Sequence, residues 1–92
     1  MKEFVNEIRS IIESARANAV RSVDFCRVQM YWQIGRRIVE EEQGGQARAE
    51  YGKGLIKNLA TEIEPEYGSG FGYRQLNFAR QFYLTYPKVN AL

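Results

Sequence analysis

The sequence predicts an all-α domain of four or five helices, chiefly because its apolar residues recur at helical spacing. The first 43 residues contain a single glycine and no proline, so long helices are expected there. Glycines at 44–45, the glycine-rich run at 68–72 and Pro87 then mark where later helices stop or start. A chain of 92 residues buries one modest core, so we expect one domain over residues 1–92.

The N-terminal segment is expected to form two helices, with a break near residues 18–22. Before the break, an apolar stripe follows the spacing of Phe4, Ile8 and Ile12. After it, Gly35 lies on the buried stripe of the second helix, which indicates the close approach of another helix. One long helix is the alternative, because an apolar stripe also runs from Val5 to Met30 without interruption.

Two further helices are expected at about residues 52–67 and 72–86. In the first, Leu55, Leu59 and Ile63 stand four residues apart and share one face. In the second, most aromatic residues fall on one half of the helix, together with Leu76 and Ala79. We therefore expect an aromatic core of Tyr31, Trp32, Phe78, Phe82 and Tyr83, and expect truncation of Trp32 to be costly.

Charge is unevenly distributed, although the net charge is only +2. Residues 67–92 hold three basic residues, seven aromatic residues and no acidic residue. The polar half of the last helix carries only side chains that can donate hydrogen bonds: Tyr73, Arg74, Asn77, Arg80, Gln81 and Thr85. A basic, acid-free end of this kind favours an anionic partner.

The composition excludes several kinds of catalytic site. Histidine is absent and Cys26 is the one cysteine, so Ser-His and Cys-His nucleophiles and an internal disulfide are ruled out, and zinc is set aside. The glutamates do not converge as paired catalytic carboxylates would, and the run at 68–72 lacks the lysine of a phosphate loop. We expect no catalysis, no metal and no cofactor in this chain.

The expected location is the cytoplasm. A lone cysteine suits a reducing compartment, and the N-terminus lacks the apolar stretch of a secretory signal. No run of apolar residues approaches the roughly 18 that a membrane span requires, so we expect no membrane association.

A helix, a glycine turn and an acid-free helix together describe a helix-turn-helix layout, which points to double-stranded DNA as the partner. Arg74 and Asn77 are the expected base or phosphate contacts. Supporting contacts are expected from Tyr73, Arg80 and Gln81, and phosphate contacts from Lys53, Lys57 and Lys88. A plain helical bundle, in which these side chains are simply solvated, remains an alternative.

A protein-interaction or dimerisation module is the rival interpretation. The stripe from Val5 to Met30 can serve as a coiled-coil seam between two copies. A homodimer is compatible with DNA binding, because helix-turn-helix domains often bind as dimers.

Several spaced motifs resemble the N-terminal domain of the YhcG family, a group of bacterial PD-(D/E)XK nuclease-like proteins. The motifs are YWQIGRRI at 31–38, RAEYG at 48–52, GF at 70–71, LNFARQFY at 76–83 and YP at 86–87. The resemblance implies a winged-helix-like DNA-binding module that positions a C-terminal nuclease domain. Gly72 stands where the family usually has serine, and the nuclease domain is expected to be absent because the sequence stops at Leu92.

Overall fold

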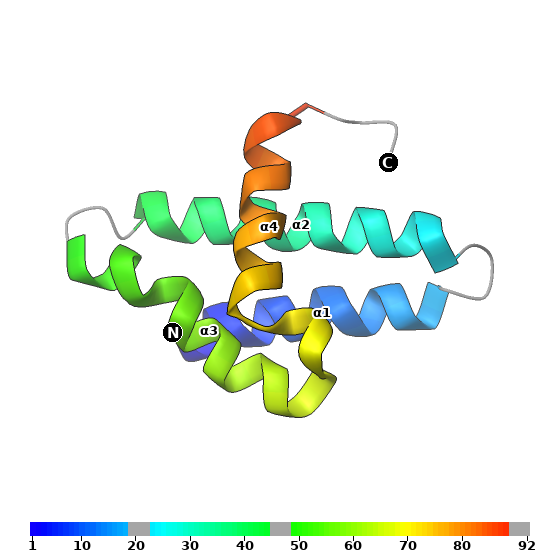
Figure 1. The fold of residues 1–92 in the computed structure, drawn as a ribbon, viewed down its shortest axis with the longest axis horizontal. Coiled ribbons are helices and arrows are strands. Elements are labelled where there is room, and N and C mark those ends of the chain that lie inside the picture. Colours follow the sequence, from blue (N-terminus) through cyan, green and yellow to red (C-terminus); the bar gives the residue numbers. More distant parts are fainter. Residues whose placement is uncertain (19–22, 45–48, 89–92) are drawn as a thin grey trace.

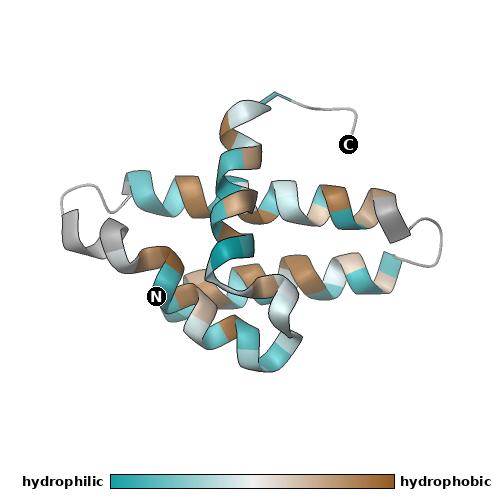
Figure 2. Cartoon of the chain, in the orientation of Figure 1, coloured by the Kyte–Doolittle hydropathy of each residue, from teal (hydrophilic) through white to brown (hydrophobic). Residues whose placement is uncertain are grey.

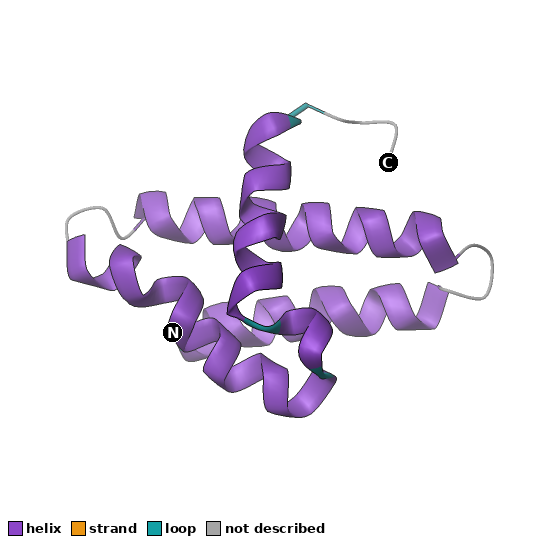
Figure 3. Ribbon diagram, in the orientation of Figure 1, coloured by secondary structure: helices purple, strands orange, loops and turns teal. Residues whose placement is uncertain are grey.

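The computed structural model describes residues 1–18, 23–44 and 49–88, apart from the side chains at 23–24 and 49–53. Four α-helices follow one another: α1 (Lys2–Asn18), α2 (Val23–Gly44), α3 (Ala49–Tyr67) and α4 (Tyr73–Thr85). A short 3-10 turn, η1 (Ser69–Phe71), joins α3 to α4. The all-α prediction is confirmed. A wing is a β-hairpin, and the described residues contain no strand, so the winged-helix-like form is not confirmed (Figure 3).

Helices α1 and α2 lie side by side and run in opposite directions (Figure 1). The predicted break is confirmed, although its own residues, 19–22, lie outside the described part of the chain. Val5, Ile8 and Ile12 are at most 2% exposed because they pack into the shared core. The prediction that the stripe from Val5 to Met30 forms a free coiled-coil seam is therefore wrong, since this domain's own helices cover it.

Helix α3 packs against both α1 and α2 and contributes to the same core. Leu55, Leu59 and Ile63 are fully buried, as the four-residue spacing predicts. Figure 2 shows apolar and polar residues interleaved along the helices, as amphipathic packing requires. None of the helices in the described ranges is apolar over enough length to cross a bilayer.

Helix α4 crosses over α2, and the crossing point is Gly35 (Figure 1). A Cβ placed on Gly35 would lie 2.0 Å from the carbonyl oxygen of Ala79 and 3.0 Å from the Cβ of Tyr83. Leu76 and Ala79 are fully buried beside this contact. The predicted close approach at Gly35 is confirmed, and α4 is the helix that makes it.

The expected aromatic core is only partly correct. The rings of Trp32 and Tyr83 pack edge to face at 5.3 Å, and Trp32 Nε1 donates a hydrogen bond to the Tyr86 carbonyl at 2.8 Å. Tyr31 stacks on Phe71 instead, with ring centroids 5.9 Å apart. Phe78 is 74% exposed, so its assignment to the core is wrong. The contact at Gly35 turns Ala79 and Tyr83 toward α2, and this rotation leaves Phe78 facing outward.

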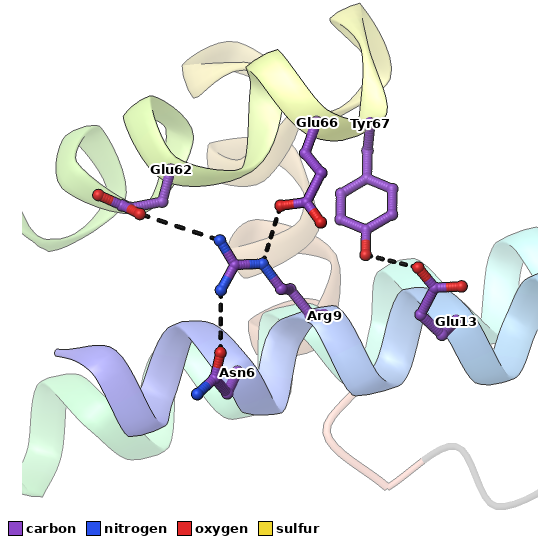
Figure 4. A network of polar contacts seen from close by, with 6 residues as sticks. All are labelled: Asn6, Arg9, Glu13, Glu62, Glu66 and Tyr67. Atoms are coloured by element: carbon purple, nitrogen blue, oxygen red, sulfur yellow. Dashed lines mark hydrogen bonds and ion pairs between the residues drawn. The ribbon is translucent and has the colours of Figure 1, made fainter.

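Polar contacts join the helices at the surface. Arg9 of α1 bonds Glu66 of α3 at 2.9 Å and lies 3.9 Å from Glu62 (Figure 4). Arg37 of α2 bonds Glu7 of α1, and this contact raises the pKa of Arg37 further above its ordinary value, against the lowering effect of burial. Exposed ion pairs of this kind contribute at most about 1 kcal/mol each, so they orient the helices more than they hold them.

The Tyr67 hydroxyl donates a hydrogen bond to Glu13 Oε2 at 2.6 Å (Figure 4). The negative carboxylate raises the pKa of Tyr67 from its usual 10.0 to about 12. In the unfolded chain the tyrosine ionises near its usual pKa, so the unfolded state loses this proton first as the pH rises. The bond therefore stabilises the fold fully below about pH 10, and this contribution is lost between about pH 10 and pH 12.

Replacement of Tyr67 by phenylalanine is expected to remove this alkaline dependence. Urea midpoints measured from pH 8 to pH 12 check the prediction. The wild type should lose more than Tyr67→Phe above about pH 10. Parallel curves would show that the hydroxyl and Glu13 do not interact in solution.

Candidate nucleic-acid interface

The connection between α3 and α4 fixes where α4 begins. Gly68 has a φ of 100°, a left-handed conformation that favours glycine, and its carbonyl accepts a hydrogen bond from the Phe71 amide at 3.0 Å. The Tyr31 hydroxyl donates to the Gly70 carbonyl at 2.7 Å, which ties the turn to α2. Helix α4 is thus anchored at its first residues as well as at its crossing with α2.

The start of α4 already has a carboxylate beside it. A Cβ on Gly72 would lie 3.0 Å from Glu64 Oε2, so this side chain sits against the first turn of the helix. The partial positive charge at a helix N-terminus attracts anions, and the Glu64 carboxylate partly neutralises it. A DNA phosphate is therefore not the natural occupant of this end.

The outward face of α4 carries an exposed stripe with no acidic residue. Its members, three or four residues apart on the helix, are Arg74, Phe78, Gln81 and Thr85. Tyr73 lies beside this stripe and is 56% exposed. We call this set, together with Asn77, the α4 face.

The structure distributes the predicted site residues unequally. Asn77 is half-buried and its amide nitrogen donates to the Tyr73 carbonyl at 3.0 Å, while Gln81 lies 3.5 Å from the Thr85 hydroxyl. Arg74 is exposed, and no carboxylate of a described residue lies within ion-pair distance of it. These four residues and Tyr73 belong to one helix face, as the spacing predicts.

The remaining predicted residues lie apart from that face or are otherwise engaged. Arg80 Nε bonds both carboxylate oxygens of Glu42 in α2, at 2.8 and 3.0 Å, so it braces the crossing of the two helices. Lys57 is exposed on α3 and Lys88 is exposed after α4. Lys53 belongs to α3, but its side chain lies outside the described residues.

The arginines of the described part fall into two groups. Four of them bind carboxylates: Arg9, Arg36, Arg37 and Arg80. Arg16, Arg27 and Arg74 have no carboxylate of a described residue within ion-pair distance, although the Arg16 guanidinium lies 5.0 Å from the centre of the Tyr67 ring. Among the arginines of the described part, these three are available to an external anion.

Two adjoining cavities beside α2 were not foreseen from the sequence. One, of about 440 Å³, lies among the C-terminal half of α1, the start of α2 and residues 67–71. The other, of about 420 Å³, lies between α2 and α4. Arg27 and Tyr31 line both, so we describe them together as the α2 groove. No local pattern predicts it, because its walls come from all four α-helices and the turn between α3 and α4.

The described residues do not gather three or more cysteine, aspartate or glutamate side chains that could hold a metal ion. Cys26 supplies the thiol that lines the α2 groove, and its Sγ contacts the Asn18 carbonyl at 3.3 Å. The geometry therefore offers surfaces for binding, in the form of the α4 face and the α2 groove.

Comparison with known proteins gives two findings. Residues 7–92 match the DUF1016 N-terminal domain. The chain is 47% identical over 79 residues to a protein of Escherichia coli (strain K12) named "Putative nuclease YhcG". That match covers 86% of this chain and 21% of the relative, so the chain spans about a fifth of that protein's length. No solved structure matches.

Proposed function

The chain belongs to the DUF1016 N-terminal domain family, and we propose that it is a DNA-binding domain that positions a nuclease domain outside residues 1–92. The observation that carries the proposal is the α4 face, which presents exposed Arg74 and hydrogen-bond donors without an acidic residue. The 47% identical relative, of which this chain covers 21%, is named "Putative nuclease YhcG", and that name supports an association with nucleic acid. In this proposal the domain binds and does not cleave.

The proposed contacts follow from exposure. Arg74 would contact a base or a phosphate, and Gln81, Asn77 and Tyr73 would add hydrogen bonds from the same face. Lys57, Lys53 and Lys88 would approach phosphates from the flanks. Arg80 would act indirectly, because its bond to Glu42 holds α4 in place. The cytoplasm, where bacterial DNA lies, is the proposed location.

Replacement of Arg74 by alanine tests the proposal. Binding of a fluorescent 20-base-pair duplex should weaken, and the slope of log affinity against log salt should flatten by about one unit if one phosphate contact is lost. Fluorescence anisotropy at several salt concentrations measures both quantities. Circular dichroism should show an unchanged fold, since Arg74 is exposed.

Arg36→Ala is the matched control. It removes the same charge from an exposed arginine, but that arginine belongs to α2 and its Nε lies 3.1 Å from Glu40 Oε2. Equal effects of the two substitutions would contradict a specific role for α4 and leave only diffuse charge.

A protein-interaction or dimerisation module is a second candidate, and one observation favours it. Phe25, Val28 and Phe78 are 46%, 42% and 74% exposed, which is unusual for large apolar side chains. A homodimer that buries Phe78 would show a concentration-dependent mass in light scattering, little affected by salt. Phe78→Ala would abolish it.

A further inference from the structure

The α2 groove is lined by cations and aromatic rings. The described residues that line it include Arg16 and Arg27 and no aspartate or glutamate. Arg74 lies one turn before Phe78 on α4 and is not among the residues that line the groove. Two of the three arginines that lack a carboxylate partner within the described ranges therefore line this groove.

One carboxylate at the edge of the groove already accepts a hydrogen bond. Glu13 contacts Tyr67 at the edge of the groove and accepts the hydrogen bond of its hydroxyl at 2.6 Å. Four other arginines show that this chain readily pairs guanidinium with glutamate where the two meet. Among the described residues Arg16 and Arg27 are exceptions without an ion-pair partner, which favours an anionic occupant of the groove.

Aromatic rings also line the α2 groove. Phe78 and Phe82 line its α4 side, and Tyr31 stands where its two cavities join. Phe78 is the most exposed of the large apolar side chains described, at 74%. Exposed rings set among arginines are typical of sites that hold unpaired nucleic acid, because bases stack on the rings while cations hold the phosphates.

We propose that the α2 groove binds an unpaired DNA strand, with a base stacked on Phe78 and phosphates at Arg27 and Arg16. This inference rests on the proposed DNA binding and adds a site for a different form of DNA. A paired duplex presents its bases edge-on and keeps them stacked, so it offers no ring face to Phe78. Duplex binding through Arg74 on the α4 face and strand binding in the groove are thus separable.

The first test compares a 12-nucleotide oligothymidine with a 12-base-pair duplex by fluorescence anisotropy. Arg27→Ala should weaken binding of the single strand and flatten its salt slope by about 0.7 units, while the duplex affinity stays the same. Arg36→Ala, which removes an exposed arginine of the same helix that is bound to Glu40, is the control and should change neither.

Phe78→Ala tests stacking on the same probe. Loss of one stacked base should weaken oligothymidine binding about 5- to 100-fold. Leu84→Ala is the matched control, because Leu84 is a 42% exposed apolar residue of the same helix that does not line the groove. The fold should survive both changes, since both side chains are largely exposed.

The chain's one cysteine provides a readout that does not depend on affinity. Cys26 lines the α2 groove, so a bound strand should shield its thiol from alkylation by iodoacetamide. Saturating oligothymidine is expected to slow the reaction, whereas saturating duplex should leave the rate unchanged.

The possible outcomes separate the two proposals. Equal losses for strand and duplex in Arg27→Ala, or an unshielded Cys26, would overturn the groove proposal while duplex binding through α4 stands. Strand binding that depends on Arg27, together with a duplex insensitive to Arg74→Ala, would support the groove and overturn the role of the α4 face. If the wild type binds neither probe but self-associates through Phe78, the groove is a protein interface and both proposals fail.

Discussion

Replacement of Gly35 by alanine is expected to destabilise the domain by about 3 kcal/mol, the upper end of typical overpacking costs. The added Cβ would lie 2.0 Å from the carbonyl oxygen of Ala79 and 2.7 Å from its carbonyl carbon. Both are backbone atoms in the middle of α4, so no side-chain rotation can relieve the contact. The whole helix must therefore move, and this movement would reduce the burial of Leu76 and Ala79.

Gly54→Ala is the matched control, because Gly54 also lies within a helix, α3. Its added Cβ would meet Asn58 Nδ2 at 3.6 Å, an ordinary contact. Alanine lowers the entropy of the unfolded chain, so this variant should gain roughly 0.4–1 kcal/mol. Urea denaturation followed by circular dichroism measures both free energies of unfolding. A Gly35→Ala protein as stable as Gly54→Ala would mean that the helices do not touch at Gly35.

The helices and their buried stripes follow from the sequence because helical periodicity is a local property. Leu55, Leu59 and Ile63 are spaced for one face, and that face is buried in the structure. Gly35 also signalled a close helix crossing, since a small residue on an apolar stripe has few other uses. The spacing left two candidates for the crossing helix, the last helix or a neighbour, because the choice depends on contacts between segments far apart in the chain.

The orientation of α4 about its own axis could not be predicted from the spacing of its residues alone. A helical wheel assigns half of the helix to the core, yet two helices that cross closely touch over only a turn or two. The contact at Gly35 selects Leu76, Ala79 and Tyr83, and Phe78 falls outside this narrow strip. The aromatic residues of the last segment therefore divide between the core and the surface.

The site residues predicted on α4 also differ in their environments. Arg74 and Arg80 both fall on the polar half of the helical wheel. Glu42, 38 residues before Arg80, binds only Arg80. That pairing exists because α4 crosses α2, which local spacing does not encode. The α2 groove is further removed from the sequence pattern, since Arg16, Arg27 and Phe78 come from three different helices.

Phe4→Ala and Phe78→Ala make the same chemical change at two sites with opposite environments. Phe4 is 2% exposed in the core, and Arg37 of α2 lies 5.1 Å from the centre of its ring. Its truncation should cost about 3–5 kcal/mol through lost burial and the cavity left behind. Phe78 is 74% exposed, so its truncation should change the free energy of unfolding by no more than about 0.5 kcal/mol.

Urea midpoints for the two variants, with an unchanged slope, give the comparison directly. The wheel alone predicts a large loss at Phe78, whereas the crossing at Gly35 predicts almost none. A loss of several kcal/mol in Phe78→Ala would place this ring in the core and remove the exposed aromatic on which strand binding depends. A large loss confined to Phe4→Ala would instead show that the Phe78 ring lies at the surface and does not stabilise the fold. That result is expected of a binding residue.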